Sequence, residues 1–263
     1  AERSGSLADH ATRLLRNAKL LPAALMARLP FRDIAAQDRF AQEHNILVLE
    51  ARDLDSYHHQ AGAMMRIAAR ARVPLAVAED AEVVMFRAEI GGEDHFAVLI
   101  GKDADLEAPL VRLHSQCITG DVLGSLKCDC GDQLQAAMRL MAENGGGVLI
   151  YLAQEGRDIG LLNKMRAYAL QDNGLDTVDA NHALGFDTDE RVFLPAARIL
   201  DALGITRLRL ITNNPDKISQ LEQCGIKVEE RVPLTLASNP HNEDYLATKK
   251  HRTGHMITDK DNR

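Results

Sequence analysis

The sequence contains no run of about 18 apolar residues, the length that a membrane-spanning helix needs. It also lacks the basic, apolar and small-residue opening of a secretory signal peptide. No internal repeat or low-complexity stretch interrupts its 263 residues. These absences favour a cytoplasmic globular protein with no membrane partner, and the length predicts one to two domains.

The sequence also has no excess of basic over acidic residues. The net charge is −7, and it is unevenly spread: residues 1–75 carry +3, whereas residues 76–263 carry −10. Proteins that bind nucleic acid polymers need a basic face, so an acidic body argues against such a partner. A small anionic ligand is compatible with this charge, provided that a few cations converge on one pocket.

Cysteine is scarce, with four residues, and its distribution is informative. Three fall within fourteen residues: Cys117, Cys128 and Cys130. This clustering, with no export signal, favours a metal site in a reducing compartment over disulfides. A catalytic zinc has three protein ligands and an open position, whereas a structural zinc would need a fourth ligand such as His114 or His182. The spacing leaves both alternatives open. Cys224 stands apart and is typical of a small buried apolar residue.

Residues 1–75 have the pattern of a small helical extension with no convergent chemistry. Helices are predicted over 6–29, where Pro22 kinks or divides the helix, over 34–44 and over 58–72. The apolar run 46–49 predicts a short buried strand.

Strands and helices alternate over residues 76–250, which predicts an α/β fold: a mixed, partly parallel sheet flanked by helices. Gly91 and Gly92 lie between two apolar runs and indicate a hairpin. A polar loop is expected over 173–190, and a frayed tail over 251–263. The remaining elements are predicted as strands over 83–86, 96–100, 111–114, 148–152, 208–211 and 226–232, and helices over 132–144, 159–172, 190–203 and 215–223.

A phosphate-binding turn is predicted at Thr212-Asn213-Asn214-Pro215. It follows a buried strand and opens a helix, so backbone N–H groups and the helix dipole would face an anion. The GxxxxGK[ST] motif of a P-loop is absent. Cations also occur at strand and loop ends around the cysteines: Arg112, Arg157, Lys164, Arg166, Arg191 and Lys217. Zinc beside such a turn suggests hydrolysis of a phosphorylated heterocycle or ester.

Six strings in this order resemble the GTP cyclohydrolase II family. They are RLHSQC at 112–117, CDCGDQ at 128–133, QEGRDIGL at 154–161, NHALGF at 181–186, DER at 189–191 and TNNP at 212–215. The resemblance runs from about residue 76 to residue 250 and leaves the first 75 residues uncovered. It therefore predicts that 76–250 is the catalytic domain.

The resemblance implies an enzyme of riboflavin biosynthesis. That family opens the imidazole ring of GTP, releases formate and pyrophosphate, and forms 2,5-diamino-6-ribosylamino-4(3H)-pyrimidinone 5′-phosphate. It implies one Zn²⁺ per chain, Mg²⁺ on the GTP triphosphate, and a homodimer. By similarity, the three clustered cysteines hold the zinc.

The resemblance also assigns roles to individual residues. Asp189 matches the proton acceptor, Arg191 the nucleophile toward the α-phosphorus, and Tyr168 a tyrosine close to the substrate. A guanidinium stays protonated because its pKa is above about 12, so stabilisation of charge by Arg191 is the alternative to covalent attack. The positions that match GTP-binding residues are Arg112, Leu113, His114, Ser115, Gln116, Gln133, Glu155, Gly156, Arg157, Thr177, Thr212 and Lys217.

Gln116 departs from the family pattern, which usually has Glu before the first cysteine. A carboxylate is acceptor-only, whereas an amide carries one acceptor oxygen and a donor NH₂. The exchange predicts weaker GTP binding with unchanged chemistry. The alternative functions are a non-catalytic nucleotide-binding paralogue and a related GTP cyclohydrolase with a different product.

Overall fold

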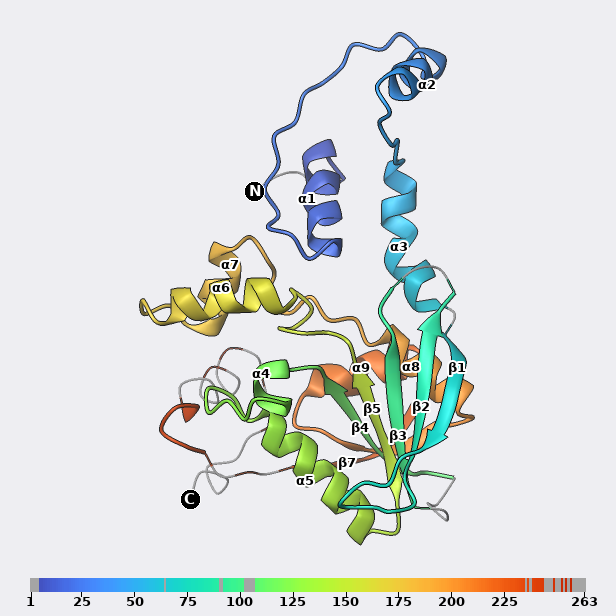
Figure 1. The fold of residues 1–263 in the computed structure, drawn as a ribbon, viewed down its shortest axis with the longest axis vertical. Coiled ribbons are helices and arrows are strands. Elements are labelled where there is room, and N and C mark those ends of the chain that lie inside the picture. The colour runs from blue at the N-terminus through green and yellow to red at the C-terminus, as the bar shows by residue number, and fades with distance from the viewer. Residues whose placement is uncertain are drawn as a thin grey trace.

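The computed structural model of the chain describes residues 5–63, 65–89, 92–101, 107–234, 236, 238–243, 248, 252, 254 and 256. A seven-stranded mixed sheet forms its centre (Figure 1). The strands are β1 (Met65–Arg72), β2 (Glu82–Ala88), β3 (His95–Ile100), β4 (Leu110–Ser115), β5 (Gly147–Leu152), β6 (Arg207–Ile211) and β7 (Lys227–Val232). The helices are α1 (Leu7–Asn17), α2 (Ile34–Glu43), α3 (Ala51–Ala63), α4 (Ile118–Asp121), α5 (Cys130–Glu143), α6 (Leu161–Gln171), α7 (Thr177–Ala183), α8 (Leu194–Ala202) and α9 (Pro215–Gln223).

The sheet has an antiparallel half and a parallel half. Its strand order is β1-β2-β3-β5-β4-β6-β7. The pairs β1–β2, β2–β3 and β3–β5 are antiparallel. The pairs β5–β4, β4–β6 and β6–β7 are parallel. The carboxyl ends of β5, β4 and β6 therefore meet at one edge of the sheet. The predicted fold class, an α/β mixed sheet flanked by helices, is confirmed.

Helices cover both faces of the sheet, and each face has its own apolar core. On one face, Phe193 and Leu200 from the α8 region pack with Val111 and Leu113 of β4. On the other face, Met141 of α5 packs with Leu110. Figure 1 shows α5 lying across this second face. Central strands that are buried on both faces carry continuous apolar runs, which is why β4 and β5 are readable from the sequence.

Three local predictions are wrong in the N-terminal part. The helix predicted over 58–72 ends at Ala63, and β1 follows it as an edge strand. Pairing of β1 with β2, for example Arg70 opposite Val84, overrides the helical preference of an Ala/Arg-rich segment. The segment 46–49 forms no helix or strand and is exposed, and Leu47 is 98% exposed. The helix predicted over 6–29 ends at Asn17.

The other predicted boundaries differ less. The polar loop over 173–190 contains α7, whose N-cap Asp176 accepts hydrogen bonds from two backbone N–H groups. Because β1 belongs to the sheet, the helical part of the extension ends before residue 64, not at 75. Gly91 of the predicted hairpin turn and residues 257–263 of the predicted frayed tail lie outside the described residues. None of the helices in the described part of the chain combines the length and the apolar character that crossing a membrane requires.

Candidate active and metal site

The site lies at the carboxyl edge of the parallel strands. Cys117 follows β4, the loop over 154–160 follows β5, and Thr212 follows β6. In open α/β sheets, ligands bind in the crevice outside this edge. The strand order thus brings together three segments that lie far apart in the sequence.

Three thiols gather at this edge. The Sγ atoms of Cys117, Cys128 and Cys130 lie within 4.8 Å of one another, and those of Cys117 and Cys128 are 3.7 Å apart. Tetrahedral zinc with Zn–S bonds of about 2.3 Å places two sulfurs about 3.8 Å apart, so the donor set fits zinc. Neither His114 nor His182 joins the group within the described residues. The arrangement fits three ligands and an open position.

The electrostatic surroundings favour an ionised thiol at Cys117 and a protonated one at Cys128. Hydrogen bonds from Cys128 and Cys130, together with the charge of Lys164, lower the pKa of the Cys117 thiol. The shared hydrogen bond with Cys117 raises the pKa of the Cys128 thiol to about 11 in the metal-free protein. A cation would displace that proton, because metal ligands bind as thiolates.

Lys164 of α6 contacts the thiol cluster directly. Its Nζ donates to Cys117 Sγ at 3.1 Å, to Thr119 Oγ1 at 2.8 Å and to Glu155 Oε1 at 2.8 Å. Burial lowers the pKa of Lys164, but the bond to Glu155 and the charge of Cys117 outweigh burial and raise it. Glu155 Oε2 accepts from the Ile118 N–H at 2.7 Å. The ion pair thus holds the backbone that follows Cys117.

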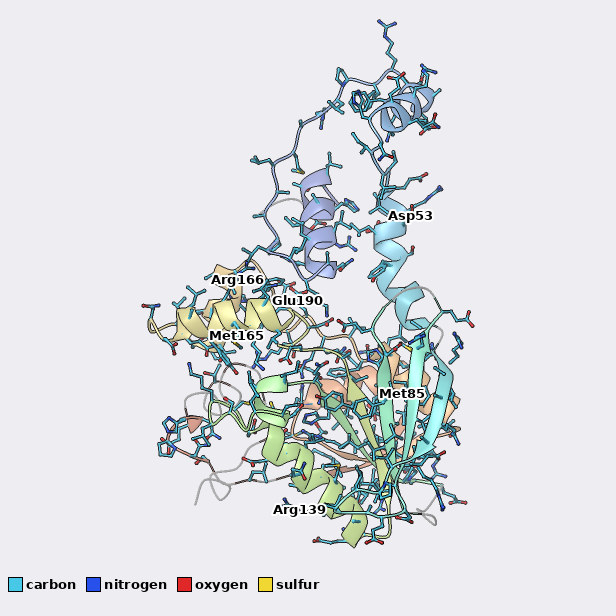
Figure 2. The ribbon with its side chains drawn as sticks, viewed as in Figure 1. Asp53, Met85, Arg139, Met165, Arg166 and Glu190 are labelled. Atoms are coloured by element: carbon cyan, nitrogen blue, oxygen red, sulfur yellow. The ribbon has the colours of Figure 1, made fainter. Side chains whose placement is uncertain are left out.

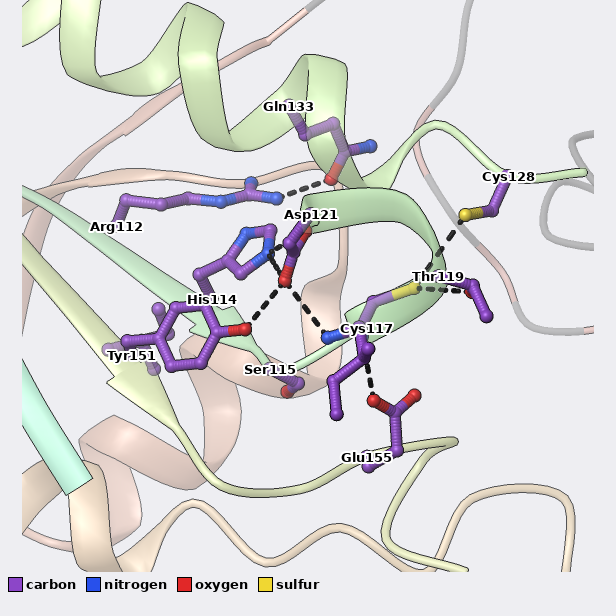
Figure 3. Close-up of polar contacts among 12 residues, drawn as sticks. Arg112, His114, Ser115, Cys117, Thr119, Asp121, Cys128, Gln133, Tyr151 and Glu155 are labelled. Carbon is purple, nitrogen blue, oxygen red and sulfur yellow. Dashed lines mark hydrogen bonds and ion pairs between the residues drawn. The ribbon is translucent and has the colours of Figure 1, made fainter. Parts of the chain in front are cut away.

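Asp121 orders the opposite side of the cluster (Figure 3). Its carboxylate accepts from Tyr151 OH at 2.8 Å, from the Cys117 N–H at 2.9 Å and from His114 Nε2 at 3.1 Å. Burial lowers the pKa of His114, so the ring is neutral near pH 7. Because a carboxylate only accepts, the proton lies on Nε2, and Nδ1 is a buried acceptor with no partner among the described residues.

Arg112 and Lys217 place two buried cations beside the thiols. Arg112 donates to the Ile211 carbonyl at 3.1 Å and to Gln133 Oε1. Its Nε is buried and has no hydrogen-bond partner among the described residues. Lys217 Nζ donates to the Leu113 carbonyl at 2.7 Å. Arg112 lies within β4, and Lys217 lies in α9, the helix that follows β6.

Two adjacent cavities, of about 100 and 90 Å³, open at the thiols. They share Ser115, Cys130, Arg157 and Arg191. The first is also lined by the predicted site residues Gln116, Cys117, Cys128, Gly156, Tyr168 and Thr177. The second is also lined by Arg112, His114, Gln133, Thr212 and Lys217. The structure therefore brings most of the predicted metal, nucleotide and catalytic residues to one double cavity.

Arg191 lines both cavities, and its guanidinium is paired with the carboxylate of Asp189. Arg191 Nε and NH2 donate to the two Asp189 oxygens at 2.8 and 2.5 Å, and NH1 donates to Ser115 Oγ at 3.4 Å. Burial raises the pKa of Asp189, but the bonds from Arg191 outweigh it and the pKa is lowered. The carboxylate stays ionised and orients the guanidinium. Asp189 lines a neighbouring cavity with Arg157.

The loop after β5 has an uncommon backbone. Gly156, Arg157 and Asp158 have positive φ angles of 67°, 61° and 73°. An L-residue in the left-handed region costs roughly 1 kcal/mol, so neighbouring groups must hold this loop. Arg157 is tied to the loop over 185–191: its NH1 donates to the Thr188 carbonyl at 3.0 Å, and its own carbonyl accepts from the Glu190 N–H at 3.3 Å.

Two predicted substrate-binding residues do not line either cavity with their side chains. Leu113 is fully buried in the apolar core, and only its carbonyl meets the site, through Lys217. The Glu155 carboxylate is buried between Lys164 and the backbone of α4. Two further residues hold the site although the sequence predicted no role for them: Asp121 and Lys164. Asp121 lies four residues after Cys117, which places it one helical turn away, and that spacing was an available signal.

Comparisons with known proteins agree with this geometry. Residues 65–233 match the family described as GTP cyclohydrolase II. A "GTP cyclohydrolase-2" of Azospirillum brasilense is 51% identical over 96% of this chain and 66% of that protein. "Riboflavin biosynthesis protein RibBA" of Salinispora tropica is 43% identical over 95% of this chain and 64% of that protein. This chain thus spans slightly less than two thirds of these two relatives. A "GTP cyclohydrolase-2" of Yersinia pseudotuberculosis is 56% identical over 64% of this chain and 85% of that protein.

Proposed function

The chain belongs to the GTP cyclohydrolase II family, and on that premise we propose that it is a zinc-dependent GTP cyclohydrolase of riboflavin biosynthesis. The reaction opens the imidazole ring of GTP and releases formate and pyrophosphate. The product is 2,5-diamino-6-ribosylamino-4(3H)-pyrimidinone 5′-phosphate. Support comes from the Yersinia relative, because the matched stretch makes up 85% of a protein with that name.

One observation carries the proposal: the three thiols open onto the same double cavity as Arg157 and Arg191. When bound there, zinc supplies a Lewis acid that activates water at neutral pH. Lys164 and Glu155 hold Cys117 in place for it. The three thiolates also favour a reducing compartment, which supports a cytoplasmic location.

Cations of the chain would bind the triphosphate. Four basic residues line the second cavity together with Thr212: Arg112, Arg157, Arg191 and Lys217. Hydrolysis at a triphosphate needs positioning and neutralisation of charge more than covalent chemistry from the protein. Mg²⁺ on the substrate's phosphates would add to this, because it is commonly held by substrate oxygens.

Arg191 is the residue that we assign to the α-phosphate. Its bidentate bond to Asp189 keeps the guanidinium charged and oriented, which suits stabilisation of developing charge. The same bond makes Asp189 a weak base. Tyr168 lines the first cavity, and burial raises the pKa of its phenol, so it can donate a hydrogen bond at neutral pH.

The test is to incubate the protein with GTP and Mg²⁺ and to measure formate, pyrophosphate and the ultraviolet spectrum of the product. All three signals are expected. Tight nucleotide binding without turnover would instead identify a non-catalytic paralogue, and formate without a pyrimidine product would identify a different cyclohydrolase. A trapped protein–GMP adduct would assign covalent attack to Arg191.

Cys128→Ser isolates the metal site. We expect loss of zinc and of formate release, while pyrophosphate release survives because it depends on cations and Mg²⁺. Cys224→Ser is the matched control, since Cys224 packs against the apolar core at the end of α9. Retention of both zinc and formate release in Cys128→Ser would overturn the metal assignment.

We also propose a homodimer, which light scattering coupled to size exclusion would test.

A further inference from the structure

The segment that leaves α1 contacts both loops of the site. This clamp segment, residues 16–22, lies before the residues that match the family. Lys19 ends the helix with a left-handed φ of 57°, and its carbonyl accepts from Asn163 Nδ2 at 2.8 Å. Asn163 is fully buried in α6 and also donates to the Ile159 carbonyl at 2.9 Å. The backbone of Lys19 is therefore fixed to the start of α6.

The first loop is held by the side chain of Lys19. Its ammonium bonds to the carboxylate of Asp158, the last of the three residues with positive φ. Gly160 lies so close that a Cβ there would be 3.3 Å from Lys19 Cβ. The loop that carries Arg157 is therefore held at its strained backbone by a residue of the extension.

The second loop is held by neighbours of Lys19. Arg16 lies 3.4 Å from an Asp187 oxygen and 3.9 Å from a Glu190 oxygen. Figure 2 labels Glu190 below the lower end of α1. Pro22 packs on Gly185, where a Cβ would be 2.8 Å from Pro22 Cγ. This loop carries Arg191, so both loops that present arginines to the double cavity meet the clamp segment.

A further cavity, of about 250 Å³, is lined by residues of both loops and by none of the three thiols. Its lining includes Arg16, Lys19, Asp158 and Glu190. Side chains therefore do not fill the space next to Asp158 in this cavity. Packing alone does not hold the loop at Asp158. The bond from Lys19 supplies a directional contact at that position.

We propose that Lys19 is a positioning residue for the nucleotide, which acts through Asp158 to hold Arg157 in its binding position. This inference rests on the proposed function, because Arg157 is taken to bind the triphosphate. It gives the helical extension a role in the site, although none of its described residues lines the cavities at the thiols. The effect falls on binding, since no reacting atom would meet Lys19.

Lys19→Met and Asp158→Asn test the proposal, with Kd for a non-hydrolysable GTP analogue, KM and kcat as readouts. Each variant is expected to raise Kd and KM about fivefold, close to 1 kcal/mol, with kcat and zinc content unchanged. The double variant should be no worse than Lys19→Met, since that substitution already removes the contact with Asp158 together with the one 3.9 Å from Glu93. Lys19→Arg should restore most of the affinity.

Arg13→Met is the matched control. Arg13 is another cation of α1, but it pairs with Asp55 of α3 at 2.7 Å and not with the site loops. Kd should stay at the wild-type value in this variant. An equal rise of Kd in Arg13→Met, or an unchanged Kd in Lys19→Met, would overturn the proposal.

Amide hydrogen exchange separates this inference from the proposed function. Lys19→Met should speed exchange over residues 156–160 without any ligand. Faster exchange, together with a wild-type protein that neither binds nor turns over GTP, would reject the proposed function and leave the anchoring of the loop supported. Unchanged exchange would reject the anchoring, even in an active enzyme.

Discussion

Replacing Lys164 with Met tests how the buried ion pair beside the thiols stabilises the fold. The Lys164 and Glu155 side chains are only 9% and 8% exposed, and their charged atoms are 2.8 Å apart. Removing the ammonium leaves a buried carboxylate that keeps the hydrogen bond from the Ile118 N–H. Breaking a buried pair from one side costs about 3–5 kcal/mol. We therefore expect the free energy of unfolding to fall by about 3 kcal/mol or more.

The double variant Lys164→Met/Glu155→Gln should recover much of this loss. Gln removes the unpaired charge and keeps an acceptor oxygen for the Ile118 N–H. Replacing both members of a buried pair by neutral groups is often nearly neutral for stability. The coupling energy between the two substitutions should be at least about 2 kcal/mol.

Urea unfolding of the metal-free, reduced protein at pH 7 measures these energies. Lys127→Met is the matched control, because Lys127 pairs with Asp172 at 2.6 Å while the two side chains are 43% and 67% exposed. It should cost no more than about 1 kcal/mol. If Lys164→Met costs no more than Lys127→Met, or if the double variant loses the sum of the two single losses, the reasoning about the buried charges is wrong.

Three further predictions concern pH and the double cavity. Burial lowers the pKa of His95 to about 4 from 6.5, so below pH 6.5 the unfolded chain binds a proton that the folded chain does not. Stability should thus be lost between pH 6.5 and 4, by about 1.4 kcal/mol per unit, and His95→Gln should flatten that slope in urea titrations. An unchanged slope would contradict the assignment. Arg191→Lys should lower kcat at least about tenfold in the formate assay, although the positive charge is preserved. An ammonium cannot form the two parallel hydrogen bonds that the guanidinium donates to Asp189. Full activity of this variant would refute the role of Arg191 at the α-phosphate. Gln116→Glu should lower KM for GTP about tenfold with kcat nearly unchanged, whereas formate release that appears only in this variant would indicate a non-catalytic natural protein.

Local patterns in the sequence determined the parallel half of the fold. The apolar runs over 111–114 and 148–152 are buried on both faces as β4 and β5, so their strand character needed no distant partner to be read. The spacing of the three cysteines likewise indicated a metal site, since thiols separated by one residue and ten residues can converge on one ion. The family strings then identified the residues that the structure gathers at the double cavity.

Tertiary contacts decided what local pattern could not. Residues 65–72 are a strand because β2 offers them an edge, although their composition favours a helix. The contacts of Lys164 with Cys117 and with Thr119 of α4 span 47 and 45 residues of chain, a relation between segments that no spacing encodes. Lys19 meets Asp158 across 139 residues of chain for the same reason. Propensity acts within a few residues, whereas the position of a side chain in the site depends on how whole elements pack, and only the folded chain determines that packing.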